Sequence, residues 1–342
     1  FLDAAGADIT EASQRKIERL FSREDFRRVR PADIGDIDIV PRALERYAVA
    51  LEQSIDTEAI AARRFKVVID YAYGSASTAM PNVLSKLGAE VLAVNPYVST
   101  AGMLGFERKA HSEQTARLVT ASEADLGAVI DPSGDQLTLI DGDGTVLDDT
   151  QLLFCFLDLV SGTHDGGMVA LPVNAPRAAG TLVESRGMKV HSTKTSAPAL
   201  MAEAEAPEVN FAANMEGGVI LPSFMTAFDA AAGLLKMLDL LTARDESLAD
   251  VLARVPEAHL VHETVVTPWE QKGLVMRSLV EQTQGRDVEL IDGVKVNHDS
   301  GWVLVLPDPE EPLTHIWTEG ESVQAARQLA QEYARRLRQM VP

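Results

Sequence analysis

The sequence predicts an α/β fold, made of successive α/β/α domains with mixed sheets and a smaller α+β domain at the C-terminal end. Between residues 65 and 94, strand-like apolar runs alternate with a helical pattern, and residues 168–191 repeat that order. Strands that alternate with helices favour a parallel sheet. From residue 259, two helical stretches flank several strand-like runs, which is typical of an α+β domain.

Composition limits the partners of this chain. Its 342 residues, 46% of them apolar, suffice for two to four globular domains. The formal net charge of −20 makes nucleic acid and anionic membranes poor partners. The single cysteine, Cys155, lies in an apolar run, which fits core packing and a reducing compartment. Because no apolar run is long enough to span a bilayer and no signal-peptide pattern is present, we expect a cytoplasmic protein.

Two helices are expected before the first strand. Thr10 is a suitable N-cap for a helix whose apolar face includes Ile17, Leu20 and Phe21, and a second helix is expected over residues 41–54. The chain begins at Phe1 without Met, in what reads as the middle of a domain, so we expect a fragment.

The first strand–helix–strand unit follows. We expect a strand over 67–70, a small-residue turn over 74–77, a helix over 80–87 and a strand over 90–94. The turn matches neither of the two glycine-rich nucleotide-binding motifs, so we interpret it as structural.

Residues 124–144 contain the most distinctive pattern. A buried strand over 126–130 ends at Asp131, and Ser133 and Asp135 follow on a tight turn before a second strand over 137–140. Ligands bind at the carboxyl edge of open α/β sheets, and Mg²⁺ prefers converging oxygens. The alternative, a solvated turn without an ion, stays open.

The later units repeat and then change the pattern. The expected elements are a strand from Met168, a helix over 175–184, a strand over 188–191, a buried helix opened by Asp229, a helix from Trp269, strands around 292–296 and 302–306, and a C-terminal helix over 322–340. His259, His262 and Glu263 invite a metal interpretation. On an extended strand, however, positions i and i+3 point to opposite faces, which disfavours a shared ion.

The segment ADLGAVIDPSGDQ resembles the metal loop of the phosphohexomutases, the family of phosphomannomutase and phosphoglucomutase. Asp131 and Asp135 match its first and third aspartates. Ser133 stands in place of the second, and Gln136 in place of the arginine. The resemblance implies a Mg²⁺ site of weakened affinity, with Gln136 on the substrate side.

Other segments extend the resemblance. GADITEASQRKIERLF resembles the helix after the family's catalytic serine loop, which implies that this serine lies upstream of Phe1; no catalytic residue is assigned within the chain. Thr193 and Lys194 occupy the place of a third-domain loop, where Lys194 either binds a sugar phosphate or is a solvated surface lysine. In NFAANMEGGVILPSF, similar to the sugar-recognition loop, Asn214 and Glu216 are candidate sugar ligands.

The loop PDPEEP stands where the family carries its phosphate-binding loop. Leu306 replaces an arginine, and Asp308 and Glu310 replace hydroxyl residues. Two like charges about 4 Å apart repel by about 4 kcal/mol at an effective dielectric constant of 20. His315 remains a candidate substrate ligand, but one imidazole does not offset three carboxylates. Phosphate binding in the family's usual manner is therefore not expected.

The resemblance implies four domains, over residues 1–61, 62–161, 162–258 and 259–342. Two functions fit it. The first is a non-catalytic mutase-like module, because the altered loops resemble the mutase-like half of bacterial proteins fused to a sugar-1-phosphate nucleotidylyltransferase. Its ligand would be a hexose phosphate or a nucleotide sugar, and its role regulatory or scaffolding. The alternative is an active phosphomannomutase or phosphoglucomutase.

Overall fold

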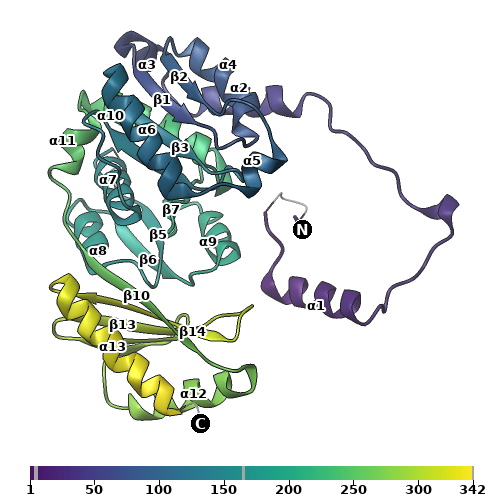
Figure 1. Cartoon of the computed structure of the whole chain (residues 1–342), viewed down its shortest axis with the longest axis vertical. Coiled ribbons are helices and arrows are strands. Elements are labelled where there is room, and N and C mark those ends of the chain that lie inside the picture. The colour runs from purple at the N-terminus through teal and green to yellow at the C-terminus, as the bar shows by residue number, and fades with distance from the viewer. Residues whose placement is uncertain (4–6, 164–165, 341–342) are drawn as a thin grey trace.

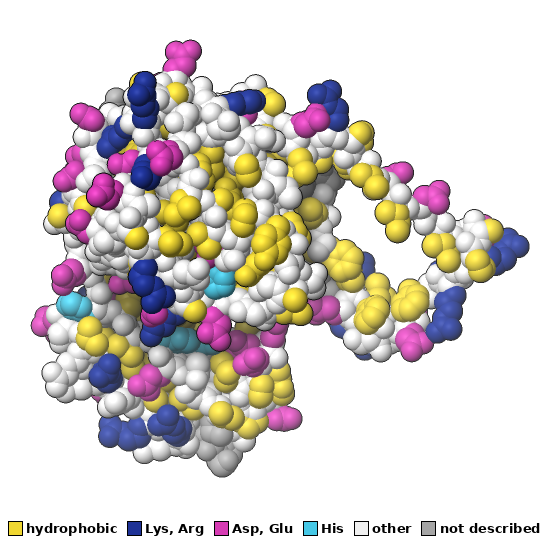
Figure 2. Space-filling model, turned by 45° about the horizontal axis from the view of Figure 1, so that its top comes forward, with side chains coloured by type: hydrophobic (Ala, Val, Ile, Leu, Met, Phe, Trp, Pro, Cys, Tyr) yellow, Lys and Arg dark blue, Asp and Glu magenta, His cyan; other side chains and the backbone are white. Residues whose placement is uncertain are grey.

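The computed structural model describes residues 1–3, 7–163 and 166–340, which form an N-terminal arm, two α/β units and a C-terminal α+β unit (Figure 1). The arm carries α1 (Glu11–Ser22) and a single 3₁₀ turn, η1 (Pro31–Asp33). As predicted, the Thr10 side chain caps α1 by accepting a hydrogen bond from Ser13 N. Apolar side chains of the arm remain exposed (Figure 2), among them Phe21 and Ile37.

The first α/β unit has four strands in the order β2-β1-β3-β4, of which β1, β2 and β3 are parallel and β4 is antiparallel to β3. The strands are β1 (Lys66–Asp70), β2 (Glu90–Val94), β3 (Leu126–Ile130) and β4 (Leu137–Asp141). The helices around them are α2 (Ala43–Gln53), α3 (Thr57–Arg63), α4 (Ala76–Lys86), α5 (Thr100–Leu104) and α6 (Arg108–Ser122). The predicted parallel sheet is confirmed.

The turn between β1 and α4 is shorter than predicted. Helix α4 begins at Ala76, four residues before the expected start, so Ala76 and Ser77 belong to the helix. Hydroxyl groups explain the difference, because Ser77 Oγ donates to Gly74 O at 2.7 Å and Thr78 Oγ1 donates to Ser75 O at 2.6 Å. These bonds let small polar residues form a first helical turn.

The second α/β unit repeats this plan in a five-stranded sheet of order β6-β5-β7-β8-β9. Strands β5, β6 and β7 are parallel, and β8 returns antiparallel to β7, as β4 does to β3. The strands are β5 (Met168–Pro172), β6 (Lys189–Thr193), β7 (Val209–Ala213), β8 (Val219–Leu221) and β9 (Met225–Phe228). The helices are α8 (Arg177–Glu184), α9 (Ala197–Ala204), α10 (Ala230–Arg244) and α11 (Leu248–Leu252).

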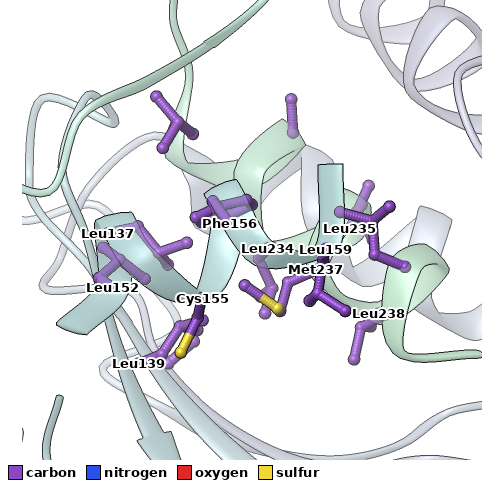
Figure 3. Close-up of a cluster of buried hydrophobic side chains, with 14 of the residues drawn as sticks. Leu137, Leu139, Leu152, Cys155, Phe156, Leu159, Leu234, Leu235, Met237 and Leu238 are labelled. Atoms are coloured by element: carbon purple, nitrogen blue, oxygen red, sulfur yellow. The ribbon is translucent and has the colours of Figure 1, made fainter. Parts of the chain in front are cut away.

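One apolar core runs through both α/β units. Helix α7 (Asp149–Ser161) and α10 lie together against β4, with Leu152, Phe156 and Leu234 among the side chains between them (Figure 3). Cys155 is fully buried in this core, as expected. Asp229 caps α10 by accepting from Ala232 N, which confirms the predicted start of that helix.

The C-terminal unit is the predicted α+β domain. Its antiparallel sheet has the order β10-β14-β13-β12-β11, with β10 (His259–Val266), β11 (Val288–Glu289), β12 (Val294–His298), β13 (Gly301–Pro307) and β14 (Leu313–Gly320). Helices α12 (Trp269–Gln282) and α13 (Val323–Met340) pack on one face and enclose a separate apolar core. The open face turns toward the second α/β unit, where Val173 packs against Trp302 and Leu304.

Hydrogen bonds also connect the C-terminal unit to the second α/β unit. The Arg177 guanidinium donates to Gly301 O at 2.9 Å, and Thr195 N and Oγ1 both donate to Asp292 Oδ2. The C-terminal unit is therefore held to its neighbour by a small apolar patch and several hydrogen bonds. In the part of the chain that the structure describes, no helix combines the length and apolar character needed to cross a membrane.

Candidate functional site

Two hairpin loops lie side by side at the edge of the α/β units. Residues 131–136 connect β3 to β4, and residues 214–218 connect β7 to β8, so each loop follows a parallel strand. Leu137 N donates to Gly217 O at 2.9 Å, and Gln136 forms a β-bridge with Gly218. The loops from the two repeated units therefore form one continuous candidate site at the edge where α/β proteins bind ligands.

Asp131 organises the first loop. Its Oδ1 accepts hydrogen bonds from Asp135 N at 2.8 Å and Gln136 N at 2.7 Å. Its Oδ2 accepts from Ser133 N at 3.2 Å and from Ser133 Oγ. A carboxylate offers about four lone-pair sites. Because all four are used by the loop itself, Asp131 is saturated, and Ser133 serves as one of its donors.

Acidic side chains gather beside this loop. Burial raises the pKa of the Asp135 carboxyl group; the polar side chain of Ser133 opposes this rise, and the negative charges of Asp131 and Asp8 add to it. Burial also raises the pKa of Asp229, although hydrogen bonds such as that from Tyr47 oppose the rise. The Tyr47 hydroxyl lies 2.8 and 3.0 Å from the two carboxylate oxygens of Asp229. The surroundings of Asp135 therefore disfavour additional negative charge.

Asn214 organises the second loop in the same way. Its Oδ1 accepts from Glu216 N at 2.9 Å and from Gly218 N at 2.8 Å. The Glu216 side chain is exposed, so its carboxylate is accessible to a ligand. Of the two residues predicted to contact a sugar, Asn214 fixes the shape of the loop and Glu216 projects from it.

Arg108, which the sequence did not single out, links the second loop to β4 and to Asp149 at the start of α7. Its guanidinium forms an ion pair with Asp149 at 2.6 Å and donates to Thr138 Oγ1 at 2.7 Å and to Glu216 O at 3.2 Å. Burial raises the pKa of Asp149, and the positive charge of Arg108 counteracts that rise. Arg108 thus ties α6, β4 and the second loop together.

A buried pair at the end of β1, Asp70 with His111, was also not predicted from the sequence. Asp70 is fully buried, and its Oδ2 lies 2.7 Å from His111 Nδ1. Its Oδ1 accepts from Asn95 Nδ2 and from Ala72 N, both at 2.9 Å. Ala72 and Asn95 have φ angles of 45° and 48°, a left-handed conformation that non-glycine residues rarely adopt. These hydrogen bonds hold the carboxyl ends of β1 and β2 together.

Thr193 and Lys194 line a cavity of about 470 Å³ at the end of β6. Thr10 and Ala12 from the N-terminal arm line it as well, together with Ile291 from the C-terminal unit. Thr193 is buried and its hydroxyl donates to Lys194 O, whereas the Lys194 side chain is exposed. The cavity therefore brings together residues from the arm, the second α/β unit and the C-terminal unit.

The acidic loop between β13 and β14 is stabilised from within. Asp308 Oδ1 accepts from Glu310 N at 2.7 Å and from Glu311 N at 2.6 Å, and Asp308 Oδ2 lies 2.8 Å from His315 Nε2. Lys272 Nζ donates to the carbonyl oxygens of Asp308 and Glu311. The predicted ligand His315 is thus paired with Asp308. The Lys272 ammonium group is already hydrogen-bonded to the backbone of the loop.

Titratable groups in the C-terminal unit make its stability depend on pH. Burial, together with repulsion from His315, lowers the pKa of His262 from 6.5 to about 4. Partial burial raises the pKa of Asp308, but hydrogen bonds from His315 and two backbone N–H groups hold it below its usual value. Below pH 6.5 the unfolded chain therefore binds protons that the folded unit does not.

We expect the C-terminal unit to lose stability as the pH falls from 6.5 to 4. Trp269, Trp302 and Trp317 are the only tryptophans in the sequence, so urea titration followed by tryptophan fluorescence reports on this unit. His262→Gln should reduce the loss of stability between pH 7 and pH 5. The same loss in the variant and in the wild type would contradict the assignment to His262.

Family models match two adjacent parts of the chain. The model of phosphoglucomutase/phosphomannomutase alpha/beta/alpha domain II matches residues 45–144, and that of domain III matches residues 148–259. The chain belongs to the phosphohexomutase superfamily. The domain III match begins at residue 148 and so includes α7, which our prediction had placed at the end of the second domain. The exact bounds of the four predicted domains remain a prediction.

Phosphohexomutases of known sequence and structure resemble the chain along nearly its whole length. The phosphoglucomutase/phosphomannomutase of Thermococcus kodakarensis is 25% identical over 335 residues, 96% of this chain and 72% of that protein. A phosphoglucosamine mutase of Methanococcus maripaludis is 22% identical over 333 residues, 95% of this chain and 74% of that protein. A phosphoglucomutase/phosphomannomutase family protein from Burkholderia thailandensis has a TM-score of 0.81 at 19% identity, covering 98% of this chain and 72% of that one.

Another phosphohexomutase structure contains magnesium. The N-acetylphosphoglucosamine mutase of Aspergillus fumigatus was solved with GlcNAc-6P and magnesium; its TM-score is 0.60 at 14% identity, covering 85% of this chain and 69% of that one. In this chain, the described residues contain no group of three or more His, Cys, Asp or Glu side chains suited to a metal. Because the loop donors saturate Asp131, the 131–136 loop does not fit Mg²⁺ in this conformation.

A single substitution tests whether the hydrogen bonds to Asp131 keep Mg²⁺ out of the 131–136 loop. Ser133→Asp removes a donor to Asp131 and adds a third carboxylate, so we expect Mg²⁺ affinity to rise at least about tenfold, as a gained charged ligand allows. Ser133→Asn, which removes the hydroxyl without adding charge, is the matched control. Isothermal titration with MgCl₂ measures both. Wild-type Mg²⁺ affinity equal to that of Ser133→Asp would show that the loop opens readily.

Proposed function

We propose that this chain is a mutase-like module that binds a hexose phosphate without converting it by itself. Its role would lie in nucleotide-sugar metabolism, as a regulatory or scaffolding part of a sugar-1-phosphate nucleotidylyltransferase. The observation that carries the proposal is the saturated carboxylate of Asp131, which leaves no lone pair for the cation that phosphoryl transfer needs.

The cavity beside Lys194 is the proposed place for the phosphate. Its ammonium group is exposed at the end of β6, next to the helix-capping residue Thr10 and the buried Thr193. By contrast, the acidic loop 307–313 carries three carboxylates, and Lys272 is bound to its carbonyl oxygens. The cavity beside Lys194 is also lined by Glu203, whose carboxylate lies 3.2 Å from His191 Nε2. Because the cavity has one carboxylate beside its lysine and the loop has three, a dianionic phosphate is favoured at Lys194 over the loop.

The exposed carboxylate of Glu216 supports the sugar part of the proposal. It projects from a loop whose backbone is fixed by Asn214 and by the contact of Gly217 with Leu137. A carboxylate carried on a fixed backbone can accept hydrogen bonds from two neighbouring hydroxyl groups of a sugar. Such an arrangement provides recognition without a chemical step.

A second candidate function is an active phosphohexomutase. The names of the relatives favour it, since they include phosphoglucomutase/phosphomannomutase and phosphoglucosamine mutase along nearly the whole chain. The joined loops at residues 131–136 and 214–218 are compatible with it as well. In this case loop 131–136 would have to rearrange so that Asp131 exchanges its backbone donors for a cation.

Titration with glucose 6-phosphate, mannose 6-phosphate and glucosamine 6-phosphate tests binding. We expect Lys194→Gln to weaken the tightest of these by about tenfold, the effect of losing one charge-assisted hydrogen bond. Lys189→Gln is the matched control, because Lys189 is an exposed lysine at the opposite end of β6. Equal hexose 6-phosphate affinities for the two variants would show that Lys194 does not bind the phosphate.

An assay of hexose 1-phosphate conversion to hexose 6-phosphate distinguishes the non-catalytic module from an active phosphohexomutase. With the matching hexose 1,6-bisphosphate and MgCl₂ present, the first proposal predicts no 6-phosphate above a protein-free blank. Measurable turnover, or a phosphoserine found by mass spectrometry in the protein from its native cell, would establish the second. The scaffolding role predicts that adding this chain changes the kinetics of a mannose-1-phosphate nucleotidylyltransferase from the same cell.

A further inference from the structure

Two histidines face each other on the open side of the C-terminal sheet. In the antiparallel register His262 pairs with Trp317 and Thr264 pairs with His315, which places the two imidazoles on a diagonal of one face. His262 Nε2 lies 2.9 Å from His315 Nδ1. Val261 and Val265, on either side of His262, belong to the core on the opposite face. Figure 2 shows histidine side chains in the hollow between the C-terminal unit and the larger body.

The surroundings fix both rings. His315 Nε2 lies 2.8 Å from Asp308 Oδ2, so this nitrogen carries the proton and Nδ1 keeps its lone pair toward His262. Asp308 is itself held by the N–H groups of Glu310 and Glu311. His262 stacks on Trp317 with ring centroids 3.8 Å apart and planes inclined by 9°. A carboxylate that orients the far nitrogen of an imidazole is the usual second layer of a histidine metal site.

We infer that His262 Nε2 and His315 Nδ1 bind a divalent transition cation of the Zn²⁺ type, with water at the remaining positions. Zinc–nitrogen bonds of about 2.0–2.1 Å in a tetrahedral site place two ligand nitrogens about 3.3 Å apart. The observed separation of 2.9 Å thus needs to open by only about 0.4 Å. Imidazole nitrogens select Zn²⁺, Ni²⁺ or Cu²⁺ over Mg²⁺.

The site differs from those that sequence patterns indicate. His262 does not share it with His259 or Glu263, its neighbours on β10, but with a residue from β14 that lies 53 positions away. It supplies only two protein ligands, because the described residues contain no metal-suited group of three or more such side chains, so water has to complete the coordination. Because His315 Nδ1 accepts the hydrogen bond from His262 Nε2, a cation that binds between the two nitrogens takes the place of that proton, which moves to Nδ1 of the His262 ring or to water.

Electrostatics favour a cation here. The adjacent loop carries Asp308, Glu310 and Glu311, and the whole chain has a formal net charge of −20. A bound cation would link β10 to β14 and partly neutralise the loop. The inference does not depend on hexose-phosphate binding, since the residues and the ligand are different.

Titration of tag-free protein with ZnCl₂ in competition with a chromophoric chelator tests the site. We expect one equivalent to bind, with affinity reduced at least about tenfold in His262→Gln and in His315→Gln. His259→Gln is the matched control on the same strand and should bind as the wild type does. Asp308→Asn should give an intermediate loss, because it releases the orientation of His315 without removing a ligand.

Imidazole NMR of the wild-type protein tests the same site without a variant that has to fold. In the wild type, Zn²⁺ should shift the imidazole NMR signals of His262 and His315 and leave those of His298 in place. Wild-type affinity no greater than that of the double variant His262→Gln/His315→Gln, or signals that move equally for all histidines, would overturn the site.

Discussion

Replacing Asp158 by Asn should lower the free energy of unfolding of the α/β units by about 2–3 kcal/mol, because it removes the buried carboxylate of two ion pairs whose guanidinium groups are 29% and 34% exposed. Asp158 lies on α7 and is 2% exposed. It pairs with Arg254 at 2.7 Å and with Arg186, and these three residues connect α7 to the chain segments after α8 and α11. Without the carboxylate, Arg186 loses this ion pair, and Arg254 keeps only its pair with Glu246 at 2.6 Å.

Fluorescence and circular dichroism report on different units, because the tryptophans are unevenly distributed. All three tryptophans lie in the C-terminal unit, whereas far-UV circular dichroism reports mainly on the α/β units. Asp158→Asn should shift the circular dichroism transition in urea and leave the fluorescence transition in place. Asp33→Asn, the same change in the exposed pair of Asp33 with Arg30, is the control and should shift neither. A shift of less than about 1 kcal/mol for Asp158→Asn would mean that the arginines find other partners.

Gly217→Ala should destabilise the junction between the two candidate loops by about 2–4 kcal/mol, the sum of a left-handed backbone cost and overpacking. Gly217 has a φ angle of 86°, and a Cβ atom there would lie 2.6 Å from Leu137 O and 2.5 Å from the Arg108 guanidinium. Leu137 O is backbone of a buried strand and cannot move aside independently. The loops would have to separate, so the hydrogen bond from Leu137 N to Gly217 O should be lost.

Hydrogen exchange at the Leu137 amide measures that loss directly, and circular dichroism measures the change in stability. Gly180→Ala provides the comparison, because Gly180 lies inside α8 and a methyl group added there would meet open space. That variant should be neutral or more stable by about 0.5–1 kcal/mol. Unchanged protection at Leu137 in Gly217→Ala would show that the two loops are not coupled through this contact.

Local patterns were sufficient to predict most elements. The bounds of β2 and β3 follow from short apolar runs between turn residues, and the caps at Thr10 and Asp229 follow from a side-chain oxygen placed before a helical pattern. The α4 start was wrong because Ala76 and Ser77 suit both a turn and a first helical turn. These are interactions between residues close in the chain.

The site was predicted less completely because its contacts are distant in sequence. Arg108 bonds to Thr138, Asp149 and Glu216, which lie 30, 41 and 108 positions away. No short motif marks such a residue. The roles of Asp131 and Asn214 show a second limit: the sequence indicated oxygen ligands, whereas the structure shows both side chains accepting backbone hydrogen bonds. Whether a side chain faces a ligand or its own loop depends on the loop conformation.

The separation of the cores limits how far a local change can spread. The two α/β units share one continuous apolar interior, whereas the last unit has an interior of its own, and the chain passes between them at residues 253–258. The molecule is thus divided into a large and a small block rather than into equal modules. Substitutions that loosen the small block, including those in the acidic loop and at the paired imidazoles, are therefore expected to leave the packing of the large block intact.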